Sequence, residues 1–157
     1  MTVDLNPLTL FTTPWFWSAF LSWTTAQIIK MTVGFIKTNQ FDFRYLLSTG
    51  GMPSAHSAMM CGLSTAIGLT EGFNTPIAML AAGFAAITMF DAAVVRRAAG
   101  IQAKIMNQMI QELFKQHKLS QTRLKELLGH TRTEVLAGLF VGIAMAMAVV
   151  RIMNGDW

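Results

Sequence analysis

Residues able to bind and transfer an anionic group gather in two short stretches of this chain. In the stretch TGGMPSAHSAM, glycines, a proline and a serine lead into His56 just where an apolar segment begins. Further along, His130 stands four residues before Glu134. Free N–H groups and the dipole at a helix start favour an anion, and the flexible backbone around Gly51 suits its approach. The two stretches therefore suggest an anion-binding site that carries two imidazoles.

Two histidines can divide the work of phosphoryl transfer, one as the nucleophile and the other as the acid. A carboxylate four residues after a histidine, as Glu134 is after His130, can hold the Nδ1–H group and so set the tautomer. Zinc would need three or four close ligands, and the chain offers His56, His130 and scattered acids, so no metal and no cofactor is expected. A serine nucleophile, Ser54 or Ser57, is disfavoured because it lacks the G-x-S-x-G context of hydrolases.

Cationic side chains lie at the ends of apolar segments, where a charge is costly and so points to function. Lys30 lies inside the first apolar block and Lys37 ends it, on one helical face, since seven residues make nearly two turns. Asp91 ends the third block, and Arg96 and Arg97 follow it. Lysines and arginines without a carboxylate cluster indicate an anionic ligand, most simply phosphate.

Each of these residues also has an ordinary explanation. Lys37 could extend its amine to the membrane interface. Arg96 and Arg97 could be stop-transfer charges, and Asp91 could pair with a cation to lower its own cost of burial. Glu134 could serve a capping box, T-x-x-E, at the start of the last helix. These explanations stay open beside the functional one.

The composition indicates an integral membrane protein. Apolar residues make up 53% of the 157 residues and charged residues 13%, against ~25% charged in typical soluble domains. Residues 5–29 carry no charge, and a span needs roughly 20 residues. Apolar blocks at about 12–36, 54–70, 75–95 and 134–152 predict four transmembrane helices. The expected fold is a single all-α, polytopic membrane domain over 1–157.

Two further patterns concern the helices themselves. Apolar residues from Ile101 to Leu113 recur with a helical period and predict an amphipathic helix lying along the membrane surface. Small residues recur at fourfold spacing, as in Gly138 and Gly142, which lets membrane helices approach closely. An equal alternative is that Gly and Ala are simply common in membrane helices.

The distribution of charge predicts an orientation. Four crossings put eleven of the twelve Lys and Arg residues on one side, with Arg151 on the other. By the positive-inside rule the basic side is cytoplasmic, and the plasma (inner) membrane is the default location. Every candidate site residue falls on that basic side. This convergence of four helix ends is the strongest indication of a site.

At this point the sequence resembles a known group. The pieces AQIIK with K-x6-K, GGMPSAHSA, DAAVVRRAAGIQA and LKELLGHTRTEV, in that order, are similar to the divergent branch of the type 2 phosphatidic acid phosphatase and vanadium haloperoxidase superfamily. The resemblance covers roughly residues 26–142. It implies that His130 attacks phosphorus, that His56 protonates the leaving oxygen and that Glu134 orients His130. It further implies phosphate binding by Lys30, Lys37 and Ser54, with Asp91, Gly51 and Pro53 in supporting positions.

The chain departs from the superfamily pattern in two ways. Leu124 stands where an arginine is expected six residues before His130, so Arg97, and then Arg96, are the residues chosen to fill that role. Membrane members of the superfamily have about six crossings, whereas four are expected here. A second copy of the chain could supply the missing scaffold, with the Gly138–Gly142 face as a candidate contact.

The sequence therefore predicts a metal-independent membrane phosphatase that hydrolyses a lipid phosphate or diphosphate through a phosphohistidine intermediate. The alternative is a non-enzymatic lipid-phosphate-binding or assembly protein, and transfer of the phosphoryl group to an acceptor other than water is a third reading. The expected partners are the lipid phosphate and membrane lipids, with a homodimer as a further expectation. No nucleic acid partner is expected.

Overall fold

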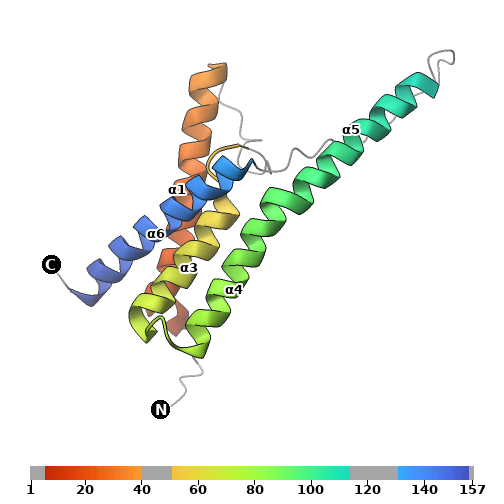
Figure 1. The fold of residues 1–157 in the computed structure, drawn as a ribbon. Helices are drawn as coiled ribbons and strands as arrows, with labels where there is room; N and C mark the ends of the chain where they lie inside the picture. Colours follow the sequence, from red (N-terminus) through yellow and green to blue (C-terminus); the bar gives the residue numbers. More distant parts are fainter. Residues whose placement is uncertain (1–5, 40–50, 114–130, 156–157) are drawn as a thin grey trace.

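A computed structural model describes residues 6–39, 51–113 and 131–155, and every regular element within these ranges is helical. The all-α class predicted from the sequence is thus confirmed for the described part of the chain. In order, the elements are the 3-10 helix η1 (Pro7–Thr12), α1 (Pro14–Thr38), α3 (Ala55–Glu71), α4 (Pro76–Phe90), the π-helical turn η2 (Asp91–Val95), α5 (Arg96–Leu113) and α6 (Arg132–Asn154) (Figure 1).

Local capping determines where the helices begin. Thr13 and Thr75 each accept a hydrogen bond from a backbone N–H three residues ahead, and each is followed by a proline at the first helical position. Ser54 caps α3 in the same way, and Thr131 caps α6. A side-chain oxygen at this position satisfies an N–H that the helix leaves unpaired. All four apolar blocks become helices with starts close to those predicted.

Helix α3 is the centre of the bundle, because it packs against α1, α4 and α6 (Figure 1). Its interior face is made of small residues, and a side chain added at Gly62 would collide with Ser22 of α1. One core cluster joins alanines of α1 and α3, and another joins Ala66 of α3 with Ala146 and Val150 of α6. Small side chains bring helix backbones close, as in other membrane proteins.

The Gly138–Gly142 face of α6 has a different role from the one considered above. A Cβ atom at Gly138 would collide with the Ser54 carbonyl oxygen, and one at Gly142 with the Ala58 carbonyl oxygen. Both glycines are buried against α3 of the same chain. This face is therefore an intrachain contact, and choosing it as the contact with a second copy was wrong. The homodimer itself stays a prediction.

Helices α4 and α5 form one continuous rod rather than two separate elements. The π-helical turn η2 links them, and α5 continues α4 away from the bundle (Figure 1). Apolar residues of α5, such as Ile101 and Met109, are more than half exposed. The amphipathic helix predicted over this stretch exists, but it extends α4 instead of starting as a separate surface helix.

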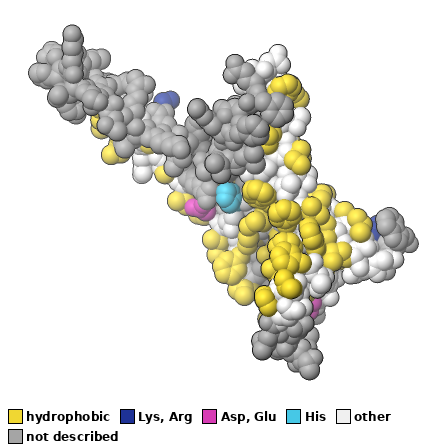
Figure 2. Space-filling view, turned by 180° about the vertical axis from the view of Figure 1, so that it is seen from behind, with side chains coloured by type: hydrophobic (Ala, Val, Ile, Leu, Met, Phe, Trp, Pro, Cys, Tyr) yellow, Lys and Arg dark blue, Asp and Glu magenta, His cyan; other side chains and the backbone are white. Residues whose placement is uncertain are grey.

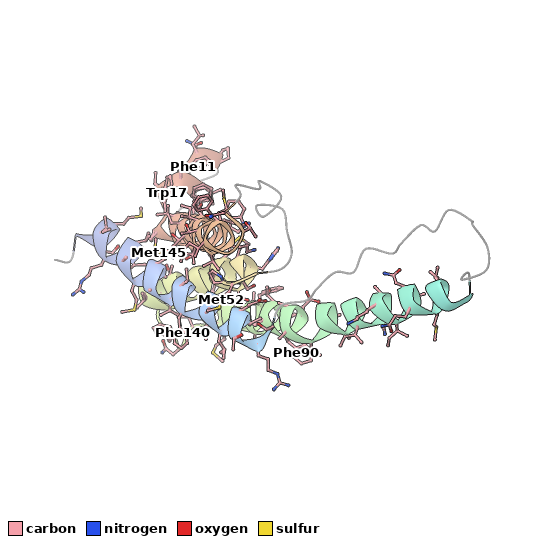
Figure 3. All side chains as sticks on the ribbon, turned by 90° about the horizontal axis from the view of Figure 1, so that it is seen from above. Phe11, Trp17, Met52, Phe90, Phe140 and Met145 are labelled. Atoms are coloured by element: carbon pink, nitrogen blue, oxygen red, sulfur yellow. The ribbon has the colours of Figure 1, made fainter. Side chains whose placement is uncertain are left out.

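Two helices are long and apolar enough to cross a membrane within the described ranges. They are the rod at Pro76–Ile110, with 35 residues, and α6, with 23 residues. Helix α3 has 17 residues, and α1 contains polar side chains that lower its mean hydropathy. Exposed aromatic residues such as Phe90 and Phe140 point outward from the two long helices (Figure 3), as lipid-facing side chains would. The four predicted crossings are thus supported for two helices.

Candidate active site

The starts of α3 and α6, the end of α4 and the turn of α1 that carries Lys30 come together at one end of the bundle. The backbone N–H of Ser54, just before α3, donates to the Glu134 carbonyl oxygen at 2.9 Å. The turn η2, at the end of α4, packs against α6. Lys30 of α1 is close enough to Glu134 for their charges to attract each other. Lys30, Ser54 and Glu134, which are far apart in the sequence, are therefore close together, and the turn η2 that carries Asp91 packs on the same helix α6.

Lys30 is the most deeply buried charged residue among the site candidates that the structure describes. Its exposed fraction is 4%. Its aliphatic chain lies along Gly51, where a Cβ atom would stand 3.3 Å from Lys30 Cγ and 3.5 Å from Cδ. Gly51 has φ +99°, a conformation that favours glycine. Burying a cation is costly unless an opposite charge stabilises it, and the Glu134 carboxylate supplies one.

Glu134 contributes both to the cap of α6 and to the electrostatics of the site. Its Oε2 atom accepts a hydrogen bond from the Thr131 backbone N–H at 2.9 Å, and the Glu134 N–H donates to Thr131 Oγ1 at 3.3 Å. The capping box considered from the sequence is thus confirmed. The same carboxylate attracts Lys30, so the cap places a negative charge beside the buried cation.

Ser54 is buried at the start of α3, where its hydroxyl caps the helix. Its side chain is 0% exposed, and Oγ accepts hydrogen bonds from the Ser57 N–H at 3.4 Å and the Ser57 hydroxyl at 3.1 Å. The hydroxyl is therefore used in capping α3 beside Gly138. Ser54 only accepts in these two bonds, which leave the proton of its own hydroxyl unused. Phosphate binding by Ser54 stays a prediction.

His56 is exposed in the first turn of α3, while Pro53 before it is buried and Asp91 is partly exposed. Figure 2 shows a histidine side chain at the surface, at the edge of a broad apolar area. The exposed imidazole of His56 is accessible to a ligand. A helix N-terminus also favours an anion near it.

Several predicted site residues lie outside what the structure describes. His130 directly precedes Thr131 in the sequence but falls in the range 114–130. The backbones of Lys37, Arg96 and Arg97 belong to α1 and α5, but their side chains lie outside the described part. The pairing of His130 with His56, and the choice between the two arginines, therefore stay predictions.

Two buried polar residues beside the site were not singled out as ligands from the sequence. Gln27 is 7% exposed and lies three residues before Lys30 on α1, and Ser57 is 0% exposed beside Ser54. The three-residue spacing to a lysine inside an apolar block is the signal that could have identified Gln27. Within residues 6–39, 51–113 and 131–155, no three His, Cys, Asp or Glu residues approach closely enough to hold a metal ion.

Comparison with known proteins identifies the class to which this arrangement belongs. The chain matches the Divergent PAP2 family over residues 11–145, and it belongs to that family. It is also similar to the "Uncharacterized membrane protein YuiD" of Bacillus subtilis (strain 168), with 39% identity over 135 residues that cover 79% of this chain and 85% of the relative. No solved structure gives a match. The family resemblance inferred from the motifs is thus confirmed. The similarity to a membrane protein agrees with the membrane character predicted from the composition.

Proposed function

We propose that this protein is a membrane phosphatase that hydrolyses a lipid phosphate or diphosphate without a metal. The main support is the position of Lys30, a cation that is 4% exposed and that α1 presents to the starts of α3 and α6. A buried lysine near one carboxylate is well suited to a ligand that brings more negative charge. Membership of the Divergent PAP2 family agrees with phosphate as that ligand.

The proposed reaction has two displacement steps at phosphorus. A ring nitrogen of His130 forms a bond to phosphorus while the bond from phosphorus to the lipid oxygen breaks, and His56 gives its proton to that oxygen. Water then attacks the phosphohistidine and gives a proton to the neutral His56, so phosphate is released, the His130 imidazole is restored and His56 is protonated again. Lys30, Lys37 and Arg97 stabilise the charge on the other phosphate oxygens, which is the main requirement in phosphoryl transfer. Glu134 orients His130 and holds Lys30.

The proposal places the site at the cytoplasmic face of the inner membrane, with a homodimer as the assembled form. If four segments cross, eleven of the twelve Lys and Arg residues fall on one side, and this distribution supports the orientation. A single-chain mass for the detergent-solubilised protein would contradict the dimer without affecting the chemistry.

Phosphate release from a panel of lipid monophosphates and diphosphates tests the activity. We expect turnover by the wild type, inhibition by vanadate, and loss of turnover in His130→Ala and in His56→Ala. His117→Ala is the matched control, because His117 is the remaining histidine of the chain and has no proposed role. Unchanged turnover in His130→Ala would refute the phosphohistidine mechanism.

One observation favours a second candidate, a protein that binds lipid phosphates without hydrolysing them. The Ser54 hydroxyl is fully buried and used as a helix cap, so one phosphate ligand implied by the superfamily is turned inward. This candidate predicts that a lipid phosphate binds saturably but that no phosphate is released from it. That result would support the binding protein over the phosphatase.

A further inference from the structure

An apolar pocket lies at the other end of α1 and α3 from Lys30. It has a volume of about 550 Å³, and among the residues that line it none is charged. At this end the Trp15 indole N–H donates to Thr70 Oγ1 at 2.7 Å, which joins α1 to α3. The apolar walls come from η1, α1 and α3: Leu10, Trp15, Phe16, Ala19, Leu63 and Ile67.

One face of α3 connects this pocket with the proposed active site. His56, Met60, Leu63 and Ile67 are spaced by four, three and four residues, which places them on a single side of the helix. Of these, His56 is exposed and the other three are partly exposed, whereas Cys61 on the opposite side is buried. Figure 2 shows an apolar surface that begins at a histidine and continues toward the other end of the bundle.

The distance along this face matches the depth of a lipid chain. Eleven residues separate His56 from Ile67 within α3, which corresponds to about 16 Å at 1.5 Å per residue. The hydrocarbon core of a bilayer is ~30 Å thick, so one leaflet accounts for about half of it. A chain that starts from a headgroup at His56 and follows α3 therefore reaches the pocket near its own end.

Helix α1 also runs from the pocket to the proposed headgroup site. Ala19 lines the pocket, and Lys30 lies eleven residues further along the same helix, about three turns away. Trp23, between them, is partly exposed beside the core cluster of Ala26, Ala55 and Ala58. The helices that present the cation and the histidine thus also present the apolar walls of the pocket.

We infer that this face of α3 and the pocket hold the hydrocarbon tail of the lipid whose phosphate lies at Lys30 and His56. The inference rests on the proposed function for the position of the headgroup. It makes the tail part of substrate selection: a lipid phosphate is a good substrate when its chain is long enough to reach Leu63 and Ile67, and a short-chain phosphate is a poor one.

Hydrolysis of alkyl phosphates that share one headgroup tests the inference. For the wild type we expect kcat/KM to be at least about tenfold higher for a long-chain than for a short-chain monophosphate, because the longer chain buries more apolar surface. Leu63→Trp fills the pocket and should reduce that ratio to near one. Met147→Trp is the matched control, since Met147 is 56% exposed on α6, and it should keep the wild-type ratio. Equal kcat/KM values of the wild type for the long-chain and the short-chain monophosphate would overturn the inference. A Leu63→Trp protein that keeps the wild-type ratio would overturn it as well.

A binding experiment separates this inference from the phosphatase proposal. We expect a lipid phosphate brominated at the chain end to quench the fluorescence of Trp15 in the detergent-solubilised protein, and one brominated beside the headgroup to quench it much less. Trp15→Phe removes the signal. Trp17→Phe keeps it, because Trp17 is absent from the pocket lining and donates to the Phe11 carbonyl oxygen.

The possible outcomes have distinct meanings. Chain-end quenching without phosphate release would support the tail site and contradict the phosphatase. Phosphate release without chain-end quenching would contradict the tail site and leave the phosphatase standing. Equal quenching by a brominated neutral phospholipid would mean that the pocket takes any bilayer lipid, and this result would also overturn the inference.

Discussion

Helices α1, α3 and α6 form both ends of the bundle, but they fill the two ends with different side chains. At one end polar groups come together: Lys30 and Ser54 are buried, and the partly exposed carboxylate of Glu134 lies near Lys30. At the other end the interior is Ala66, Ala146 and their apolar neighbours, next to an open apolar pocket. Burying polar groups costs free energy unless they meet partners. The two ends therefore depend on different interactions: the polar end on charge attraction and hydrogen bonds, the apolar end mainly on the packing of apolar side chains.

The largest expected effect comes from removing the cation at the polar end. Lys30→Met keeps an unbranched side chain only one atom shorter and removes its charge, so we expect kcat to fall by roughly 10²-fold or more, as when one transition-state donor is lost. Phosphate release from a lipid phosphate measures it. Ser64→Ala in the middle of α3 is the control, since Ser64 has no proposed role. Full activity in Lys30→Met would contradict the proposal that Lys30 at the polar end binds the phosphate.

A large effect on stability is expected where α6 meets α3. Gly138→Ala places a Cβ atom against the Ser54 carbonyl oxygen, so the two helices must separate, at a cost of about 1–3 kcal/mol of the free energy of unfolding. Gly83→Ala is the matched control, because a Cβ atom there has nothing within 4 Å among the described residues. Thermal unfolding in detergent compares them. Equal stability of the two variants would contradict this packing of α3 on α6.

A smaller effect is expected from the cap of α6. Thr131→Ala removes the hydroxyl that accepts the Glu134 N–H and should lower the free energy of unfolding by about 1 kcal/mol. Because the cap also positions the Glu134 carboxylate, we expect kcat to fall as well. Thr131→Ser, which keeps the hydroxyl, should restore both. A loss in Thr131→Ser equal to that in Thr131→Ala would show that the cap is not the cause.

The smallest effect is expected at the apolar end. Thr70→Val removes the acceptor of the Trp15 indole hydrogen bond, and we expect a loss of about 1 kcal/mol in the free energy of unfolding. The hydrolysis of a short-chain phosphate should not change, because Thr70 lies at the end of α3 away from His56. A strong loss of that activity would mean that the two ends are coupled.

Much of the fold was predictable from the sequence because helix starts depend on contacts within four residues. Thr13 and Thr75, each followed by proline, mark two starts, and the capping box of Thr131 and Glu134 marks another. Apolar period and length located the helices between these starts. The continuity of α4 with α5 was not predicted, because the charged residues Arg96 and Arg97 resemble the end of a span in the sequence although the backbone continues through η2.

The sequence by itself determined the helices, their caps, the membrane character and the family, since these follow from the order of neighbouring residues and from motif spacing. Only the tertiary structure decided that Gly138 packs against α3 of the same chain, that the Ser54 side chain is buried, and that Lys30 lies close enough to Glu134 for their charges to attract. The physical reason is that these contacts join residues far apart in the chain. Their geometry depends on how closely small side chains let α1, α3 and α6 approach, which no local pattern specifies.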